Sequence, residues 1–155
     1  MSVALQQANQ AYHCGEVPVG CVITHPSVGF VVSHNQCEEK MDATQHAEVV
    51  AINKMAKLLN SYRLKHCTLY VTLEPCVQCC GAIVLARISQ VIYGAPEPKS
   101  GGAKSLFNIL DCGRLNHKCG VHGGLLEARS ASILKKFFKE KRQPSKGLSE
   151  SCKPE

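Results

Sequence analysis

The sequence predicts an α/β fold in three layers, α/β/α, with helices on both faces of a central mixed sheet of about five strands. Stretches with helical spacing and short β-branched runs follow one another in the order α, β, β, α, β, α, β, which is typical of a sheet covered by helices. The chain has 155 residues, enough for one domain and too few for two. Hydrophobic residues make up 45% of it and charged residues 19%, so we expect a chain that folds around a single core.

The first half of this pattern is a hairpin between two helices. Residues 3–14 carry apolar side chains on one helical stripe, which ends at Gly15. Residues 17–23 and 28–33 are β-branched runs separated by a turn that contains Pro and Ser, and this arrangement predicts a β-hairpin. Helical spacing returns over residues 43–59.

The second half alternates strands and helices. Residues 68–73 predict a strand that stops at Pro75, because proline cannot donate a hydrogen bond to a sheet. Residues 76–87 predict a buried helix, and residues 88–93 predict another strand. After a loop rich in Gly and Pro, we expect one brief strand near residues 119–122.

The C-terminal segment carries much of the positive charge. Residues 125–141 predict the last helix, and residues 144–155 predict a basic, polar, disordered tail beyond a domain that spans residues 1–143. The net charge of the chain is +6, and residues 135–155 hold seven Lys and Arg against three Glu. Such a cluster can contact the phosphates of a nucleic acid, or it can be a solvated helix face that keeps the protein in solution.

Composition narrows the possible function classes. The longest apolar stretch, residues 82–86, is far shorter than the roughly 18 residues of a membrane span, so we expect no membrane partner. Residues 1–10 lack the basic and apolar regions of a secretory signal, which predicts a cytoplasmic protein. Aromatic residues make up only 5%, which leaves little material for stacking single-stranded bases. In a reducing compartment, the ten cysteines favour free thiols or metal ligands over disulfides.

Two short segments carry residues suited to metal chemistry. Residues 46–48 (His-Ala-Glu) open a predicted helix, and residues 75–79 (Pro-Cys-Val-Gln-Cys) lie where a strand turns into a helix. Cys76 and Cys79 are three residues apart, so both sulfurs project from one face of the first turn, where the helix dipole stabilises thiolate. With His46 they would give Zn²⁺ three ligands and leave the fourth position to a water, whose pKa the metal lowers to about 7.

Each segment alone has a plainer interpretation. A single His on a helix is more often a hydrogen-bonded structural residue than a ligand, and a C-x-x-C pair in a cytosolic protein can be a thioredoxin-like redox pair. Together, His-x-Glu followed by Pro-Cys-x-x-Cys matches the signature of the zinc-dependent deaminases.

The wider sequence resembles one branch of that superfamily, the tRNA-specific adenosine deaminases, from about residue 3 to residue 143. The resemblance rests on residues 16–20 (Glu-Val-Pro-Val-Gly), residues 42–48 and the run at residues 68–76 (Thr-Leu-Tyr-Val-Thr-Leu-Glu-Pro-Cys). It implies a cytidine deaminase-like fold and the conversion of the wobble adenosine of a tRNA anticodon to inosine.

The resemblance also implies the metal site. It places one Zn²⁺ per chain on His46, Cys76 and Cys79. A zinc-bound hydroxide then attacks the ring carbon that carries the exocyclic amine, and Glu48 is the catalytic proton shuttle.

The substrate contacts and the partners follow from the same resemblance. Asn35 and Ala47 fall on substrate-binding positions, although Asn35 is also typical of a turn after a strand. The implied partners are a tRNA anticodon stem-loop and a second copy of the chain in a homodimer, as in bacterial relatives. Eukaryotic relatives instead pair a catalytic chain with an inactive one.

Two other functions stay open at this point. The same zinc site serves deaminases of free bases or nucleosides, such as guanine or cytidine, and a zinc subunit without activity could help another chain bind tRNA. The basic end of the chain argues against the first, and Glu48 argues against the second, because a scaffold needs no carboxylate beside an open metal position. A second metal site is conceivable, although its spacing fits no known pattern; its candidate ligands are Cys112, His117, Cys119 and His122.

Overall fold

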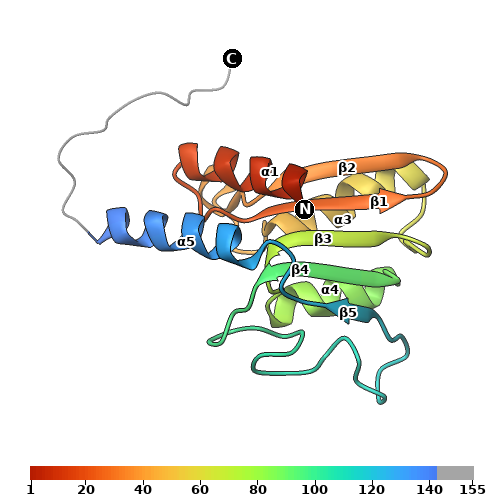
Figure 1. Cartoon of the computed structure of the whole chain (residues 1–155). Helices are drawn as coiled ribbons and strands as arrows, with labels where there is room; N and C mark the ends of the chain where they lie inside the picture. Colours follow the sequence, from red (N-terminus) through yellow and green to blue (C-terminus); the bar gives the residue numbers. More distant parts are fainter. Residues whose placement is uncertain (143–155) are drawn as a thin grey trace.

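A five-stranded mixed sheet lies at the centre of the structure, a computed structural model that describes residues 1–142 (Figure 1). The strands are β1 (Gly20–His25), β2 (Gly29–His34), β3 (Thr68–Leu73), β4 (Gln90–Ala95) and β5 (Gly120–His122). Their order across the sheet is β2-β1-β3-β4-β5. β1 pairs antiparallel with β2 and β3, whereas β3–β4 and β4–β5 are parallel pairs.

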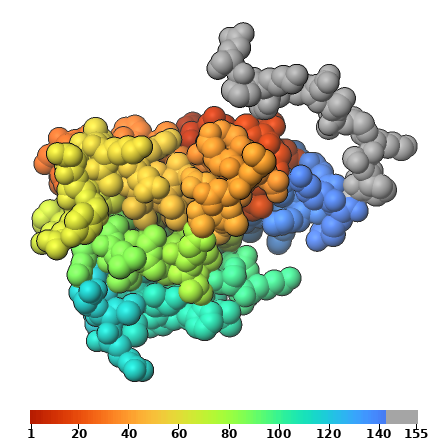
Figure 2. Space-filling view, turned by 180° about the vertical axis from the view of Figure 1, so that it is seen from behind, coloured from red at the N-terminus to blue at the C-terminus, as the bar shows by residue number. Residues whose placement is uncertain are grey.

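Helices cover both faces of this sheet. They are α1 (Ser2–His13), α3 (Ala47–Leu59), α4 (Val77–Ala86) and α5 (Glu127–Lys141), and the short helix α2 (Cys37–Lys40) lies between β2 and α3 along the chain. α1 and α5 contact each other and pack on one face, while α3 and α4 lie together on the other, as Figure 1 shows. In the view from behind, residues of α3 (yellow-orange) and α4 (green) face the reader (Figure 2). The predicted three-layer α/β/α fold is confirmed.

The core joins the sheet to the α3 and α4 layer. Ile23, Leu69 and Val91 come from three different strands, and their side chains are fully buried. They belong to one apolar cluster with Met55 of α3 and Ile83 of α4. Because these side chains lock both helices against the same strands, the N-termini of α3 and α4 are held in fixed positions.

The second long helix begins four residues later than the sequence pattern predicts, at Ala47 instead of residue 43. The preceding residues form a turn around Asp42. Its carboxylate accepts hydrogen bonds from the backbone N–H of Thr44 at 2.8 Å and from the Gln45 amide at 2.9 Å. An aspartate that bonds the backbone two residues ahead favours a turn over a helix. The turn leaves His46 at the N-cap of α3, in extended conformation.

Other boundaries differ by a few residues. β1 begins at Gly20 and β4 at Gln90, both later than predicted, and the short helix α2 was not predicted. The tail predicted over residues 144–155 lies outside the described residues. Within residues 1–142, none of the helices combines the length and the apolar character that crossing a bilayer requires.

Candidate metal and catalytic site

The N-termini of α3 and α4 meet at one point. His46 is the N-cap of α3 and Cys76 is the N-cap of α4, and both have extended backbone conformations. The imidazole Nδ1 of His46 lies 3.5 Å from the sulfur of Cys76 and 3.4 Å from that of Cys79. The three ligand atoms lie within 4.8 Å of one another, so one ion could contact all three. The fold thus brings together the predicted metal-ligating residues.

This donor set fits zinc. One imidazole nitrogen and two sulfurs are common zinc ligands in proteins. A tetrahedral ion with Zn–S bonds of about 2.3 Å and a Zn–N bond of about 2.0 Å holds the nitrogen and each sulfur roughly 3.5 Å apart. The nitrogen–sulfur distances at this site are 3.4 and 3.5 Å. The residues therefore fit a tetrahedral ion with one position left over.

Cys76 and Cys79 shift each other's pKa in opposite directions. The hydrogen bond from Cys79 lowers the pKa of Cys76 to about 4, and the same contact raises the pKa of Cys79. Hydrogen bonding to Cys76 also raises the pKa of His46. One thiolate is thus already favoured at neutral pH, and metal binding needs to displace only one further proton from the pair.

A cleft of about 530 Å³ opens beside these residues. His46 and Cys76 line it together with Glu48, which is in the first turn of α3 and only 4% exposed. Burial raises the pKa of the Glu48 carboxyl. A carboxyl group whose pKa is raised toward neutrality can both accept and release a proton during a reaction.

The two predicted substrate-binding residues lie at different depths. Asn35 follows directly after β2, is 6% exposed and lines the cleft. Ala47 is fully buried and does not line the cleft, and its carbonyl accepts a hydrogen bond from the Ser33 hydroxyl at 2.6 Å. Its backbone N–H belongs to the first turn of α3, where helix N–H groups have no partner within the helix. Any contact of Ala47 with a substrate would therefore use the backbone.

Sequence reasoning missed Glu74, which shapes the wall of the cleft. Its carboxylate is 2% exposed and accepts hydrogen bonds from the backbone N–H groups of Glu97, Lys104 and Ser105 at 2.7–2.9 Å. Burial alone would raise the pKa of Glu74, but these bonds and one from the Ser105 hydroxyl outweigh it and lower the pKa. A Cβ at Gly101 would lie 2.7 Å from Oε1 of Glu74 and 2.5 Å from the backbone oxygen of Glu97, so only glycine fits there. A carboxylate placed between a strand and Pro75 is the signal that could have identified it.

The C-terminal helix also reaches the cleft. Phe137, Phe138 and Lys141 of α5 line it. Phe137 is buried against the ring of Tyr12 in α1, with ring centroids 5.8 Å apart, whereas Phe138 is 44% exposed. The described part of the basic segment, at the end of α5, thus borders the cleft.

Two of the four candidate ligands of a second metal have other contacts. Cys119 is buried in the core, and the ring N–H of His117 donates to the carbonyl of Ile88 at 2.7 Å. In the part of the chain that the structure describes, the one group of three or more such residues close enough for a shared ion is His46, Cys76 and Cys79.

Comparisons with known proteins agree with this geometry. The family model of the MafB19-like deaminases matches residues 1–142. A tRNA-specific adenosine deaminase of Streptococcus pyogenes serotype M18 is 46% identical over 146 residues, which cover 94% of this chain and 92% of the relative. A tRNA-specific adenosine deaminase of Aquifex aeolicus is 45% identical over 142 residues, which cover 92% of this chain and 93% of the relative.

A solved structure extends the likeness to the fold. It comes from a study of A-to-I editing by tRNA:A34 deaminases at the wobble position of transfer RNA, and it superimposes with a TM-score of 0.83 at 39% identity. The match covers 86% of this chain and 97% of that one. A deaminase family model over the whole described chain, close relatives of nearly equal length and this shared fold lead to one conclusion: the chain belongs to the tRNA-specific adenosine deaminase family.

Proposed function

We propose that this chain converts the wobble adenosine of a tRNA anticodon to inosine by zinc-dependent hydrolysis. The observation that carries the proposal is the group of His46, Cys76 and Cys79 beside the buried carboxyl of Glu48, all at one cleft. Membership of the tRNA-specific adenosine deaminase family supports the choice of substrate. The reaction consumes one water and releases ammonia.

His46, Cys76 and Cys79 would hold one Zn²⁺ per chain. When bound, the ion would act as a Lewis acid and lower the pKa of a water in the position that the protein leaves open. The chain's own contribution is to fix the three ligands at two helix N-termini, whose dipoles favour the negative charge of the thiolates. These positions depend on the packing of α3 and α4 rather than on a flexible loop.

Glu48 would transfer the protons. Its carboxylate takes a proton from the attacking water and passes it to a ring nitrogen of the adenine. It then takes the remaining proton of the hydroxyl group that has added to the ring carbon and delivers it to the exocyclic amine, which leaves as ammonia. Burial raises the pKa of Glu48, which makes the carboxylate a stronger base toward the attacking water.

The cleft would admit the target base and little more. Its volume of about 530 Å³ is in the usual range for a small ligand, far below that of a stem-loop. The wobble nucleotide would therefore turn out of the anticodon loop into the cleft, where Asn35 contacts it through its amide and Ala47 through its backbone N–H. The rest of the stem-loop would lie on the rim, which includes Phe138 and Lys141 of α5. We place this reaction in the cytoplasm, together with its tRNA substrate.

A second copy of the chain is the proposed protein partner. The outer face of α4 exposes Val77 (48%) and Leu85 (73%), with Gly81 between them on the same face. An exposed apolar stripe on a helix favours packing against another surface. We expect light scattering to give a dimer mass for the native chain and a monomer mass for Leu85→Glu. A native monomer would contradict the homodimer.

The proposed substrate is tested with short RNAs. The purified chain is incubated with an anticodon stem-loop that has adenosine at the first anticodon position, and the product nucleosides are identified by mass spectrometry. In one control, the same stem-loop has its adenosine moved one position along the anticodon. In three others, the RNA is replaced by free adenosine, by guanine or by cytidine. We expect inosine from the first RNA alone. Deamination of a free base or nucleoside without reaction of the RNA would contradict the proposal.

A further inference from the structure

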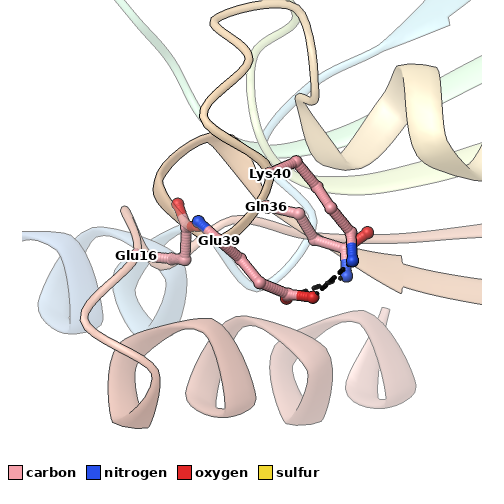
Figure 3. A network of polar contacts seen from close by, with 4 residues as sticks. All are labelled: Glu16, Gln36, Glu39 and Lys40. Carbon is pink, nitrogen blue, oxygen red and sulfur yellow. Dashed lines mark hydrogen bonds and ion pairs between the residues drawn. The ribbon is translucent and has the colours of Figure 1, made fainter. Parts of the chain in front are cut away.

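Glu16 is a buried carboxylate with two partners from different parts of the chain. It lies between α1 and β1, lines the cleft and is 1% exposed. Its Oε2 accepts a hydrogen bond from Asn35 Nδ2 at 2.9 Å, and its Oε1 accepts one from the backbone N–H of Glu39 at 2.8 Å. Figure 3 shows the carboxylate facing this backbone nitrogen in α2, while the Glu39 side chain points away toward Gln36 and Lys40.

This contact determines which way the Asn35 amide is turned. Both Glu16 oxygens act as acceptors in these contacts, so the amide atom that faces Oε2 at 2.9 Å is the Asn35 nitrogen. The amide oxygen Oδ1 of Asn35 then faces away from Glu16 and accepts a hydrogen bond from the thiol of Cys37 at 3.7 Å. With the opposite flip, two oxygens would face each other at a buried site. Glu16 therefore selects one of the two flips.

We propose that Glu16 is a positioning residue for substrate binding, which acts by holding the Asn35 amide in this flip. The amide nitrogen has two N–H groups; Glu16 takes one, and the other remains for a ring nitrogen of the base, which is a hydrogen-bond acceptor. Without Glu16, the amide could adopt the opposite flip in a fraction of the protein molecules. Its oxygen would then face the ring nitrogen, and two acceptors cannot form a hydrogen bond. The inference rests on the proposed function, since it assigns the second N–H to the adenine.

Glu16 also has a structural role, and the test must distinguish this role from its effect on the Asn35 amide. Through the backbone of Glu39 it ties α2 to the segment that follows α1. In Glu16→Gln, the new amide offers one oxygen to two donors, so one contact is lost while the side-chain size is kept. Glu39→Gln is the matched control. It removes a carboxylate from the same network, bonded by Gln36 at 3.1 Å and Lys40 at 2.7 Å, and it keeps the backbone N–H.

The test is a double-mutant cycle on kcat/KM for the anticodon stem-loop. We expect Asn35→Ala to lower kcat/KM about tenfold and Glu16→Gln about fivefold, the range of one hydrogen bond, with the loss mainly in KM. In the Asn35→Ala background, Glu16→Gln should change kcat/KM less than about twofold, because its target is already gone. Glu39→Gln should stay within about twofold of the native chain. The same fivefold loss in both backgrounds would overturn the inference.

A second measurement tests the contact without relying on activity. Asn35→Asp places two carboxylates side by side and should lower the melting temperature. Adding Glu16→Gln should raise it again, because the introduced glutamine amide can donate to the new carboxylate. We expect this double variant to remain poor in kcat/KM, since the introduced aspartate has no N–H for the base.

The outcomes separate the two proposals. A native chain that makes no inosine would contradict the proposed function, while the melting temperatures still test the contact between residues 16 and 35. A double variant no more stable than Asn35→Asp would overturn the inference even if the native chain is active.

Discussion

The imidazole of His46 lies 3.4 Å from the sulfur of Cys79, although 33 residues separate them along the chain. The contact exists because His46 ends the turn before α3, while Cys79 lies in the first turn of α4. Two helices packed on the same face of the sheet thus point their N-termini at one spot. Metal binding and proton transfer at this site therefore depend on residues at the N-termini of both helices.

Cys79→Ala should remove the metal. With only His46 and Cys76 left as ligands, we expect zinc affinity to fall more than about 100-fold, since even groups that merely support a ligand are worth about 10- to 100-fold. Competition with a chromophoric chelator measures the affinity. Cys80→Ala is the control, because the Cys80 thiol is buried in the core, donates to the Pro75 carbonyl and is not one of the three grouped residues. Equal zinc affinity in Cys79→Ala and the native chain would refute the assignment.

Glu48→Gln should separate metal binding from turnover. The amide keeps the size of the side chain but cannot take up a proton at neutral pH, so kcat should fall by about 10² to 10⁴. Zinc content should be unchanged, because the three ligands are intact. The melting temperature should be equal or higher, since the substitution removes a buried ionisable group. A variant with full zinc and near-native kcat would show that another group moves the protons.

Glu74→Gln should loosen the wall of the cleft. The amide cannot accept all the hydrogen bonds that the carboxylate receives from residues 97–105, so we expect a loss of about 1–3 kcal/mol in the free energy of unfolding. Denaturant titration measures it. Glu97→Gln is the control in the same loop, where the carboxylate accepts one bond, from Lys99, and the change should stay within about 0.5 kcal/mol. An equal loss in the free energy of unfolding for both variants would mean that the hydrogen bonds to Glu74 do not stabilise the loop more than the single bond to Glu97 does.

Lys141→Gln should weaken RNA binding in a salt-dependent way. Lys141 is at the end of α5 on the cleft, with its ammonium 5.5 Å from the centre of the Phe137 ring. Loss of one phosphate contact should reduce the slope of log affinity against log salt by about 1. Lys57→Gln, in the last turn of α3, should leave the slope unchanged. A slope unaffected by Lys141→Gln would favour the solvated-face interpretation of the basic end.

The sequence predicted those features that arise from local spacing. The three-residue separation of Cys76 and Cys79 indicates a shared helix face, and the alternation of strands and helices indicates the layers. The late start of α3 was missed because the Asp42 turn competes with helical spacing over the same residues. Glu16 and Glu74 were missed as structural anchors because their partners lie 19 to 31 residues away. No periodic pattern links such positions, and only the folded chain brings them together.

The central claim is that one zinc ion on His46, Cys76 and Cys79 enables the chain to deaminate the wobble adenosine. The most direct measurement strips the purified chain of metal with a chelator and returns Zn²⁺ in steps. Inosine formed in the anticodon stem-loop is measured at each step. The account predicts no inosine from the stripped chain, a rate proportional to the zinc bound and a plateau at one ion per chain. A full rate of inosine formation by a chain that holds no zinc would contradict it.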